Sequence, residues 1–104
     1  MSNSMFIHHV YFWLKNPESG EDKAQLVNGL KDLSAVETIE SFHIGYPADT
    51  DRGVIDRSYS VSWLLIFRSK ADQDIYQVHP LHLKFIEGCS HLWQKVVVYD
   101  SVDI

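Results

Sequence analysis

The stretch Met5-Phe6-Ile7-His8-His9-Val10-Tyr11-Phe12-Trp13-Leu14-Lys15 decides the fold of this chain. Large apolar and aromatic side chains occupy almost every position, and Asn16-Pro17 ends the run. A short apolar run bounded by turn residues is typical of a β-strand. Bulky residues at successive positions place apolar groups on both faces of the sheet. The sequence therefore predicts a strand over residues 5–15 that is buried on both faces.

The remaining pattern predicts two helices and three more strands. Ser19 and Ser69 each precede an acidic residue by three positions, which is the signature of a helix N-cap. The first helix is amphipathic, while the second is broken at Pro80 and resumes to about His91. The three further strands are expected over residues 39–44, 58–67 and 93–99.

This order is βαββαβ, which predicts an α+β, ferredoxin-like domain with a four-stranded antiparallel sheet. Two helices cover only one face of such a sheet. The strands over 5–15, 58–67 and 93–99 nevertheless carry bulky apolar residues for both faces. Because a large uncovered apolar face is a liability in a monomer, we expect two copies to pack sheet against sheet as a homodimer. A monomer with a flatter, partly hydrated face is the alternative.

Length and composition bound the class of protein. A chain of 104 residues predicts one domain over residues 5–104, with the polar residues 1–4 disordered. The net charge of −5 argues against nucleic-acid binding, which needs a basic face. Cys89 is the single cysteine and excludes an intrachain disulfide. Without a signal-peptide pattern or an apolar run long enough to cross a bilayer, we expect a cytoplasmic protein that does not bind membranes.

The second helix concentrates the side chains best suited to proton transfer. Tyr76, His79 and His82 lie around Pro80 among large apolar residues. Phenols and imidazoles both donate and accept hydrogen bonds near neutral pH. Their clustering on a kinked segment indicates a pocket rather than a hydrated surface.

This segment also carries a resemblance to a known family. Tyr76-Gln77-Val78-His79-Pro80-Leu81-His82 is similar to the Tyr-x-x-His-Pro-x-His signature of the stress-responsive dimeric α/β-barrel family, abbreviated Dabb. The resemblance extends from His9 to Asp100. Its other matching pieces are His9-Val10-Tyr11-Phe12, Phe42-His43-Ile44-Gly45, Phe67-Arg68-Ser69 and Val97-Val98-Tyr99-Asp100.

The resemblance implies a homodimer whose sheets form a dimeric α/β-barrel, with a cavity between sheet and helices in each protomer. A plant polyketide-cyclase branch of the family closes a ring by aldol-type chemistry without a cofactor. Its catalytic pair matches Tyr76 and His82, and its supporting residues match His9 and Asp100. The loop over residues 47–57 is longer and more charged here than in those cyclases.

The side chains fit these roles chemically. An imidazole is suited to remove a proton next to a carbonyl group, and His82 is the first candidate. The phenol of Tyr76 can donate to the oxygen on which negative charge develops. Asp100, at the end of the last strand, is expected to hold one ring nitrogen of His82. His9 is expected to line the cavity, so that His8 points to the opposite face. The alternative is that Tyr76 and His82 only pack beneath the helix with satisfied polar tips.

His79 is expected to support the site structurally, by bonding to the backbone carbonyl groups that Pro80 frees. His79 and His82 are three residues apart, which invites a metal site. Pro80 lies between them, and no Glu or Cys completes a ligand set at a diagnostic spacing. We therefore predict no metal and no other cofactor.

Three functions remain open from the sequence. The first is cofactor-free acid–base chemistry, of the enolisation or aldol type, on a small apolar carbonyl compound. The second is a non-catalytic protein that binds a small apolar or aromatic ligand or protects against stress. The third is a quinol or haem oxygenase, by analogy with other dimeric ferredoxin-like barrels.

Overall fold

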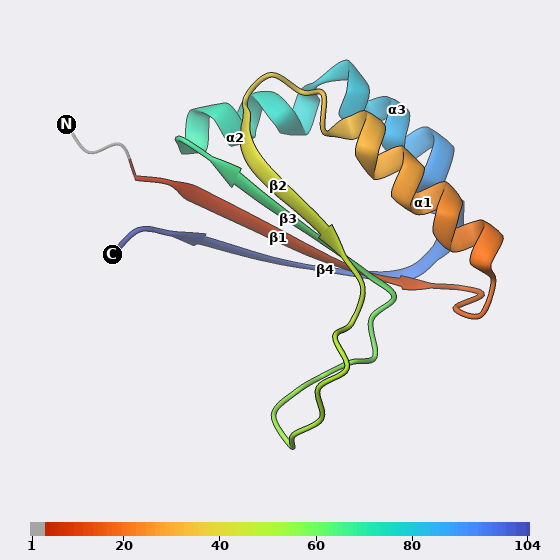
Figure 1. Cartoon of the computed structure of the whole chain (residues 1–104). Helices are drawn as coiled ribbons and strands as arrows, with labels where there is room; N and C mark the ends of the chain where they lie inside the picture. The colour runs from red at the N-terminus through yellow and green to blue at the C-terminus, as the bar shows by residue number, and fades with distance from the viewer. Residues whose placement is uncertain (1–3) are drawn as a thin grey trace.

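The computed structural model describes residues 4–104. It confirms the predicted order of helices and strands, with the second helix divided into two (Figure 1). The elements are β1 (Phe6–Leu14), α1 (Gly20–Leu33), β2 (Ile39–Gly45), β3 (Val61–Phe67), α2 (Lys70–Val78), α3 (Pro80–Cys89), the 3-10 turn η1 (Ser90–Leu92) and β4 (Trp93–Val102).

The strands form one antiparallel sheet in the order β2-β3-β1-β4. The stretch over residues 5–15 therefore becomes a central strand, paired with β3 on one side and β4 on the other. The helices lie together on one side of the sheet (Figure 1). This is the predicted ferredoxin-like arrangement.

Local sequence signals account for the helix boundaries. The Ser19 hydroxyl accepts a hydrogen bond from the backbone N–H of Asp22, and Ser69 accepts one from Asp72. Both predicted N-caps are thus present. Pro80 occupies the first turn of α3, where its missing N–H costs no intrahelical bond.

The two faces of the sheet differ. Residues of β1 alternate strictly between buried and half-buried. The buried set faces the helices and packs with alternate residues of β3 and with apolar residues of α1. The largest of these core side chains that are almost wholly buried are Trp63, Tyr76, Phe67, Leu14, Leu26, Leu30, Leu33 and Leu65.

The half-buried set of β1 lies on the other side of the sheet, which we call the open face. Cross-strand pairing adds residues of the other three strands to it: Leu64 pairs with both His9 and His43, and Tyr99 also pairs with His9. The open face comprises Ile7, His9, Tyr11, Trp13, His43, Leu64, Ile66, Val97 and Tyr99. No helix of residues 4–104 covers it (Figure 1).

Two strand boundaries differ from the prediction. The strand β3 begins at Val61 rather than at residue 58. Ahead of it, the backbone N–H of Ser60 still donates to the Phe12 carbonyl, while side chains make the other bonds: the Ser60 hydroxyl accepts from the backbone N–H of Leu14, and the Ser58 hydroxyl accepts from Trp13 Nε1. Strand β4 continues to Val102, where it pairs with the start of β1 at Phe6. The loop between β2 and β3 projects away from the sheet (Figure 1).

The expected disorder at the start of the chain concerns residues 1–4, of which residues 1–3 lie outside the described residues. Ser4 is described and lies two residues before the first residue of β1, Phe6. None of the helices within residues 4–104 has the length and apolar character needed to span a membrane.

Candidate active site

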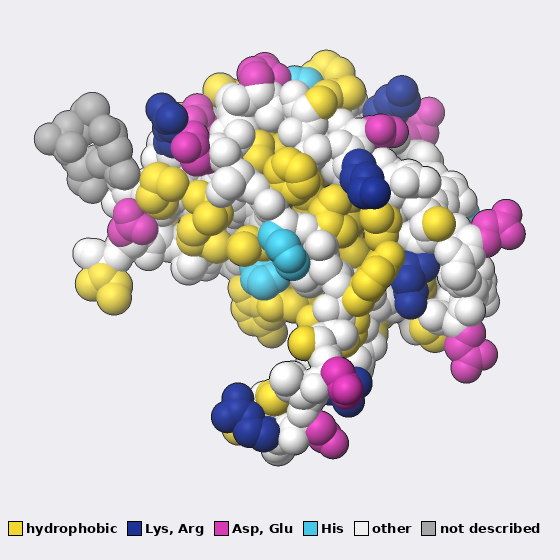
Figure 2. All heavy atoms as spheres, in the orientation of Figure 1, with side chains coloured by type: hydrophobic (Ala, Val, Ile, Leu, Met, Phe, Trp, Pro, Cys, Tyr) yellow, Lys and Arg dark blue, Asp and Glu magenta, His cyan; other side chains and the backbone are white. Residues whose placement is uncertain are grey.

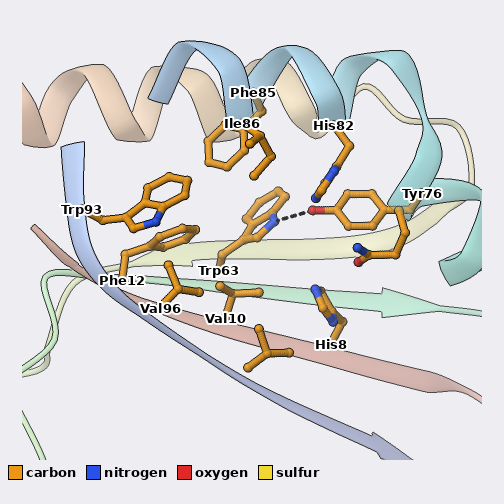
Figure 3. A pocket seen from close by; sticks show the side chains of 12 residues that line it. His8, Val10, Phe12, Trp63, Tyr76, His82, Phe85, Ile86, Trp93 and Val96 are labelled. Carbon is orange, nitrogen blue, oxygen red and sulfur yellow. Dashed lines mark hydrogen bonds between the residues drawn. The ribbon is translucent and has the colours of Figure 1, made fainter. Parts of the chain in front are cut away.

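A cavity of about 140 Å³ lies between the sheet and the helices α2 and α3 (Figure 3). A volume of this order holds a compound about the size of benzene and is too small for a haem. Ile86, Val96 and Val98 are each more than a third exposed, so the cavity opens between α3 and the edge strand β4. The cavity is lined by His8, Val10, Phe12, Trp63, Tyr76, Gln77, His82, Phe85, Ile86, Trp93, Val96 and Val98.

The two ends of the cavity differ in chemistry. Phe12, Phe85 and Trp93 form an aromatic cluster, with ring centroids 4.9 Å apart for Phe12 and Trp93 and 5.7 Å apart for Phe85 and Trp93. His8, Tyr76 and His82 lie toward the other end (Figure 3). A ligand with an apolar body and one polar oxygen matches this division.

His8, rather than His9, is the first-strand histidine at the cavity. The Nδ1 atom of His8 lies 2.6 Å from Asp100 Oδ1, because the two residues are directly paired across β1 and β4. The expectation that Asp100 holds His82 is therefore wrong, and so is the expectation that His8 points away. Since the carboxylate accepts the proton of Nδ1–H, the neutral form of the His8 imidazole carries its lone pair on Nε2.

Tyr76 is buried in the core, and its hydroxyl lies at the cavity. Trp63 Nε1 donates a hydrogen bond to the Tyr76 oxygen at 3.4 Å, drawn as the dashed line in Figure 3. Burial raises the pKa of Tyr76 to about 12, against a small opposing effect of the Trp63 bond. The phenol therefore keeps its proton at neutral pH, and the O–H remains a donor for a ligand.

His82 stands edge-on to Tyr76, with their ring centroids 4.8 Å apart. Burial, and to a smaller extent the neighbouring His8, lower the pKa of His82. Its Nδ1 atom is buried and has no hydrogen-bond partner within residues 4–104. A buried N–H without an acceptor is costly, so this position favours the tautomer with the proton on Nε2. His82 is thus a neutral imidazole that can donate from Nε2.

His79 joins the two helices that carry Tyr76 and His82. Its Nδ1 accepts a hydrogen bond from the backbone N–H of Leu81 at 3.0 Å, and its Nε2 lies 3.2 Å from Glu37 Oε2. The expected bond to freed backbone carbonyl groups is therefore wrong: the imidazole caps the N-terminus of α3 instead. His79 is outside the cavity lining and lies at the junction between α2 and α3.

Replacing His79 should test this capping role. We expect His79→Ala to lower the free energy of unfolding by about 1 kcal/mol, as the loss of other N-caps does. His79→Asn, which keeps a short acceptor, should retain most of the stability. Glu37→Gln is the matched control, because the exposed Glu37 contact contributes little. Urea unfolding measures all three; an alanine variant as stable as the wild type would contradict the role.

His9 lies on the open face and not in the cavity, which corrects its expected position. Its ring stacks on Tyr11 with centroids 4.4 Å apart, and its Nδ1 lies 3.3 Å from the Tyr11 hydroxyl. Its Nε2 is buried without a partner within residues 4–104. Burial, followed by His43 and His8, lowers the pKa of His9.

Because the pKa values of His9 and His82 are lowered in the folded protein, the free energy of unfolding should depend on pH. The unfolded chain binds protons at these sites more readily than the folded chain does, so the free energy of unfolding should fall as the pH drops through the ordinary histidine range near ~6.5. Urea unfolding at fixed protein concentration between pH 8 and pH 5 measures this slope. His82→Gln should flatten it, whereas His91→Gln, an exposed position, should not. A slope unchanged by His82→Gln would contradict the assignment.

A metal site receives no support from the geometry. Over the described part of the chain, residues 4–104, no group of three or more His, Cys, Asp or Glu side chains is placed to hold a metal ion.

Together, the sheet order, the single helical layer and the cavity define a ferredoxin-like α+β domain with a small site beneath its second helical segment. Residues 6–103 match the family model of the Stress responsive A/B Barrel Domain, Dabb. The chain therefore belongs to this family. No protein with a curated description matches the sequence.

Solved structures extend the comparison. A Dabb family protein with a ferredoxin-like fold from Mesorhizobium loti is 28% identical with a TM-score of 0.79, and the alignment covers 97% of this chain and 98% of that one. The hydroxynitrile lyase of Passiflora edulis is 20% identical with a TM-score of 0.80 and coverages of 99% and 96%. A dimeric ferredoxin-like protein of unknown function from Thermobifida fusca is 16% identical with a TM-score of 0.77 and coverages of 97% and 92%. At these identities the last two show similarity of fold alone.

Proposed function

We propose that the protein is an enzyme that moves a proton next to the carbonyl group of a small, mostly apolar compound, as in enolisation or an aldol-type reaction. The observation that carries this proposal is the convergence of His8, Tyr76 and His82 on one cavity of about 140 Å³. These groups supply a base and two hydrogen-bond donors, so the reaction needs no cofactor.

Within this proposal, His8 is the base. Asp100 holds its Nδ1 proton, which leaves Nε2 free to accept a proton from the carbon next to the carbonyl group. The same carboxylate stabilises the imidazolium that results. This assignment replaces the sequence-based hypothesis that His82 is the base supported by Asp100.

Tyr76 and His82 then stabilise the oxygen on which charge develops. Both are neutral donors at neutral pH, because burial raises the pKa of Tyr76 to about 12 and lowers that of His82. Donors held in a mostly apolar cavity stabilise an enolate more strongly than water does. When the proton returns from His8 to carbon, the enzyme is restored.

We further propose that two copies pair through the open face as a homodimer. Leu64 and Ile66 lie there without a helical cover, and Tyr99 is 65% exposed. In Figure 2, hydrophobic side chains gather over the middle of the view and acidic side chains lie around its margin. The Thermobifida fusca neighbour is described as dimeric, which supports the same assembly here. The cavity lies on the helical side of the sheet, so this pairing leaves it accessible.

A second candidate is a binding protein without catalysis. It is favoured by the apolar character of most of the cavity lining and by the Tyr76 oxygen, which already accepts a bond from Trp63. The two candidates share a ligand class and differ in whether a proton is exchanged.

Hydrogen–deuterium exchange separates the two candidates. Cyclohexanone, whose ring is close to benzene in size, is incubated with the protein in D₂O, and loss of its α-proton signal is followed by NMR. The proposal expects exchange well above the buffer rate, lowered on the order of 10²-fold in Tyr76→Phe. Binding without exchange, or exchange at the same rate in Tyr76→Phe, would contradict the enzymatic proposal, and the first of these outcomes would favour the binding protein.

A further inference from the structure

The helix α2 carries a pair of side-chain amides next to Tyr76. Gln73 is buried, with 7% of its surface exposed, and lies one helical turn before Gln77. Its Nε2 donates a hydrogen bond to Gln77 Oε1 at 2.8 Å. When a buried amide donates a hydrogen bond to a neighbouring side chain, that bond orients the neighbouring side chain.

The bond has a consequence for the cavity. Gln77 is one of the lining residues, together with Tyr76, His82 and His8. Its Oε1 is engaged by Gln73, so the group left over is the Nε2 amide with its two N–H donors. Within residues 4–104, this Nε2 donates to no protein acceptor. Gln77 itself is exposed, so its amide lies at the mouth of the cavity, where the buried Gln73 orients it and no protein acceptor in the described part of the chain takes its N–H groups.

We infer that Gln77 contacts the substrate directly, donating an amide N–H to the same ligand oxygen as Tyr76, and that Gln73 is the residue that positions it. This inference rests on the proposed function for the identity of the ligand, a compound with a carbonyl oxygen. An amide is well suited to this role because it donates without titrating, whereas the neighbouring imidazoles change charge with pH. Preorganised donors of this kind stabilise a developing enolate oxygen.

The test compares two ligands of the same shape. Cyclohexanone carries the carbonyl oxygen, and methylenecyclohexane replaces it with a CH₂ group that accepts no hydrogen bond. We expect the wild type to prefer the ketone, and Gln77→Met to weaken ketone binding roughly tenfold while leaving the alkene unchanged. Gln25→Met, on the exposed side of α1, is the matched control and should alter neither affinity.

The positioning role of Gln73 needs a measurement that reports on the Gln77 amide itself and not only on the stability of the fold. In ¹⁵N-labelled protein, the side-chain NH₂ signals of Gln77 should shift when cyclohexanone is added. Gln73→Glu cannot donate to Gln77 Oε1, so the Gln77 amide should turn toward the new carboxylate and its response to the ketone should be lost. Thermal unfolding of the same variant monitors the fold, and an unchanged ketone response in Gln73→Glu would overturn the positioning role.

The outcomes distinguish this inference from the proposed function. If the wild type exchanges the ketone protons and Gln77→Met binds and exchanges as before, the inference fails and the function stands. If the wild type binds the ketone without exchange, the function fails, and a lost preference in Gln77→Met still supports the contact. A wild type that does not prefer the ketone over the alkene overturns the inference.

Discussion

Replacing His8 with Gln should lower the exchange rate of cyclohexanone by about 10²- to 10⁴-fold, the usual contribution of a general base. The amide of Gln keeps the hydrogen bond to Asp100 but cannot take a proton. Asp100→Asn should lower the rate as well, since the imidazolium then loses its carboxylate. The exchange assay measures all of these rates by NMR.

The neighbouring histidine provides the matched control. His9 is one residue away but lies on the open face, so His9→Gln should keep the rate within a few-fold of the wild type. Sedimentation at the same concentration checks that each variant keeps its assembly. If His9→Gln abolished exchange and His8→Gln did not, the placement of the base would be wrong.

Replacing Leu64 with Lys should dissociate the proposed homodimer. Leu64 is at the middle of the open face, between His9 and His43 in the cross-strand register. In a pair of copies packed through this face, each would bury an unpaired ammonium group. Because such a charge costs several kcal/mol, the dimer dissociation constant should rise at least about 1,000-fold.

The control for this substitution is Leu83→Lys on α3, where the side chain is already 58% exposed. It adds the same charge away from the open face and should leave the assembly unchanged. Light scattering coupled to size exclusion gives the mass of each variant. A Leu64→Lys variant that remains dimeric would mean that the open face is not the interface.

The fold could be predicted from local signals because each signal acts within a few residues. Ser19 and Ser69 each start a helix by accepting a hydrogen bond from the backbone N–H three residues later. Pro80 divides the second helix because its ring removes a backbone N–H donor. The apolar run over residues 5–15 predicted a strand, which the structure places at the centre of the sheet with one face buried and the other half-buried.

The site was harder to predict because it depends on contacts across strands. Both faces of β1 carry large side chains, so alternation alone does not tell whether His8 or His9 faces the helices. The register between β1 and β4 decides this by pairing His8 with Asp100, and that register follows from packing of the whole sheet. Tyr76 and His82 were accessible to prediction because only six positions separate them, near the ends of the adjoining helices α2 and α3.

Two further members of the site carried no recognisable pattern. Trp63 is a large aromatic residue of β3, and its bond to Tyr76 joins β3 to α2. Gln77 lies inside the signature segment, but its role depends on the burial of Gln73 one turn earlier. Spacing on α2 is the only sequence signal that pairs these amides.

The most direct test of the central claim is a crystal structure of the wild-type protein soaked with cyclohexanone. We expect the ketone in the cavity beneath α2 and α3, with its oxygen about 3 Å from Tyr76 Oη and its α-carbon facing the His8 ring. A ketone bound elsewhere, or in the cavity with its oxygen directed away from Tyr76 and His82, would contradict the claim that these residues form an acid–base site.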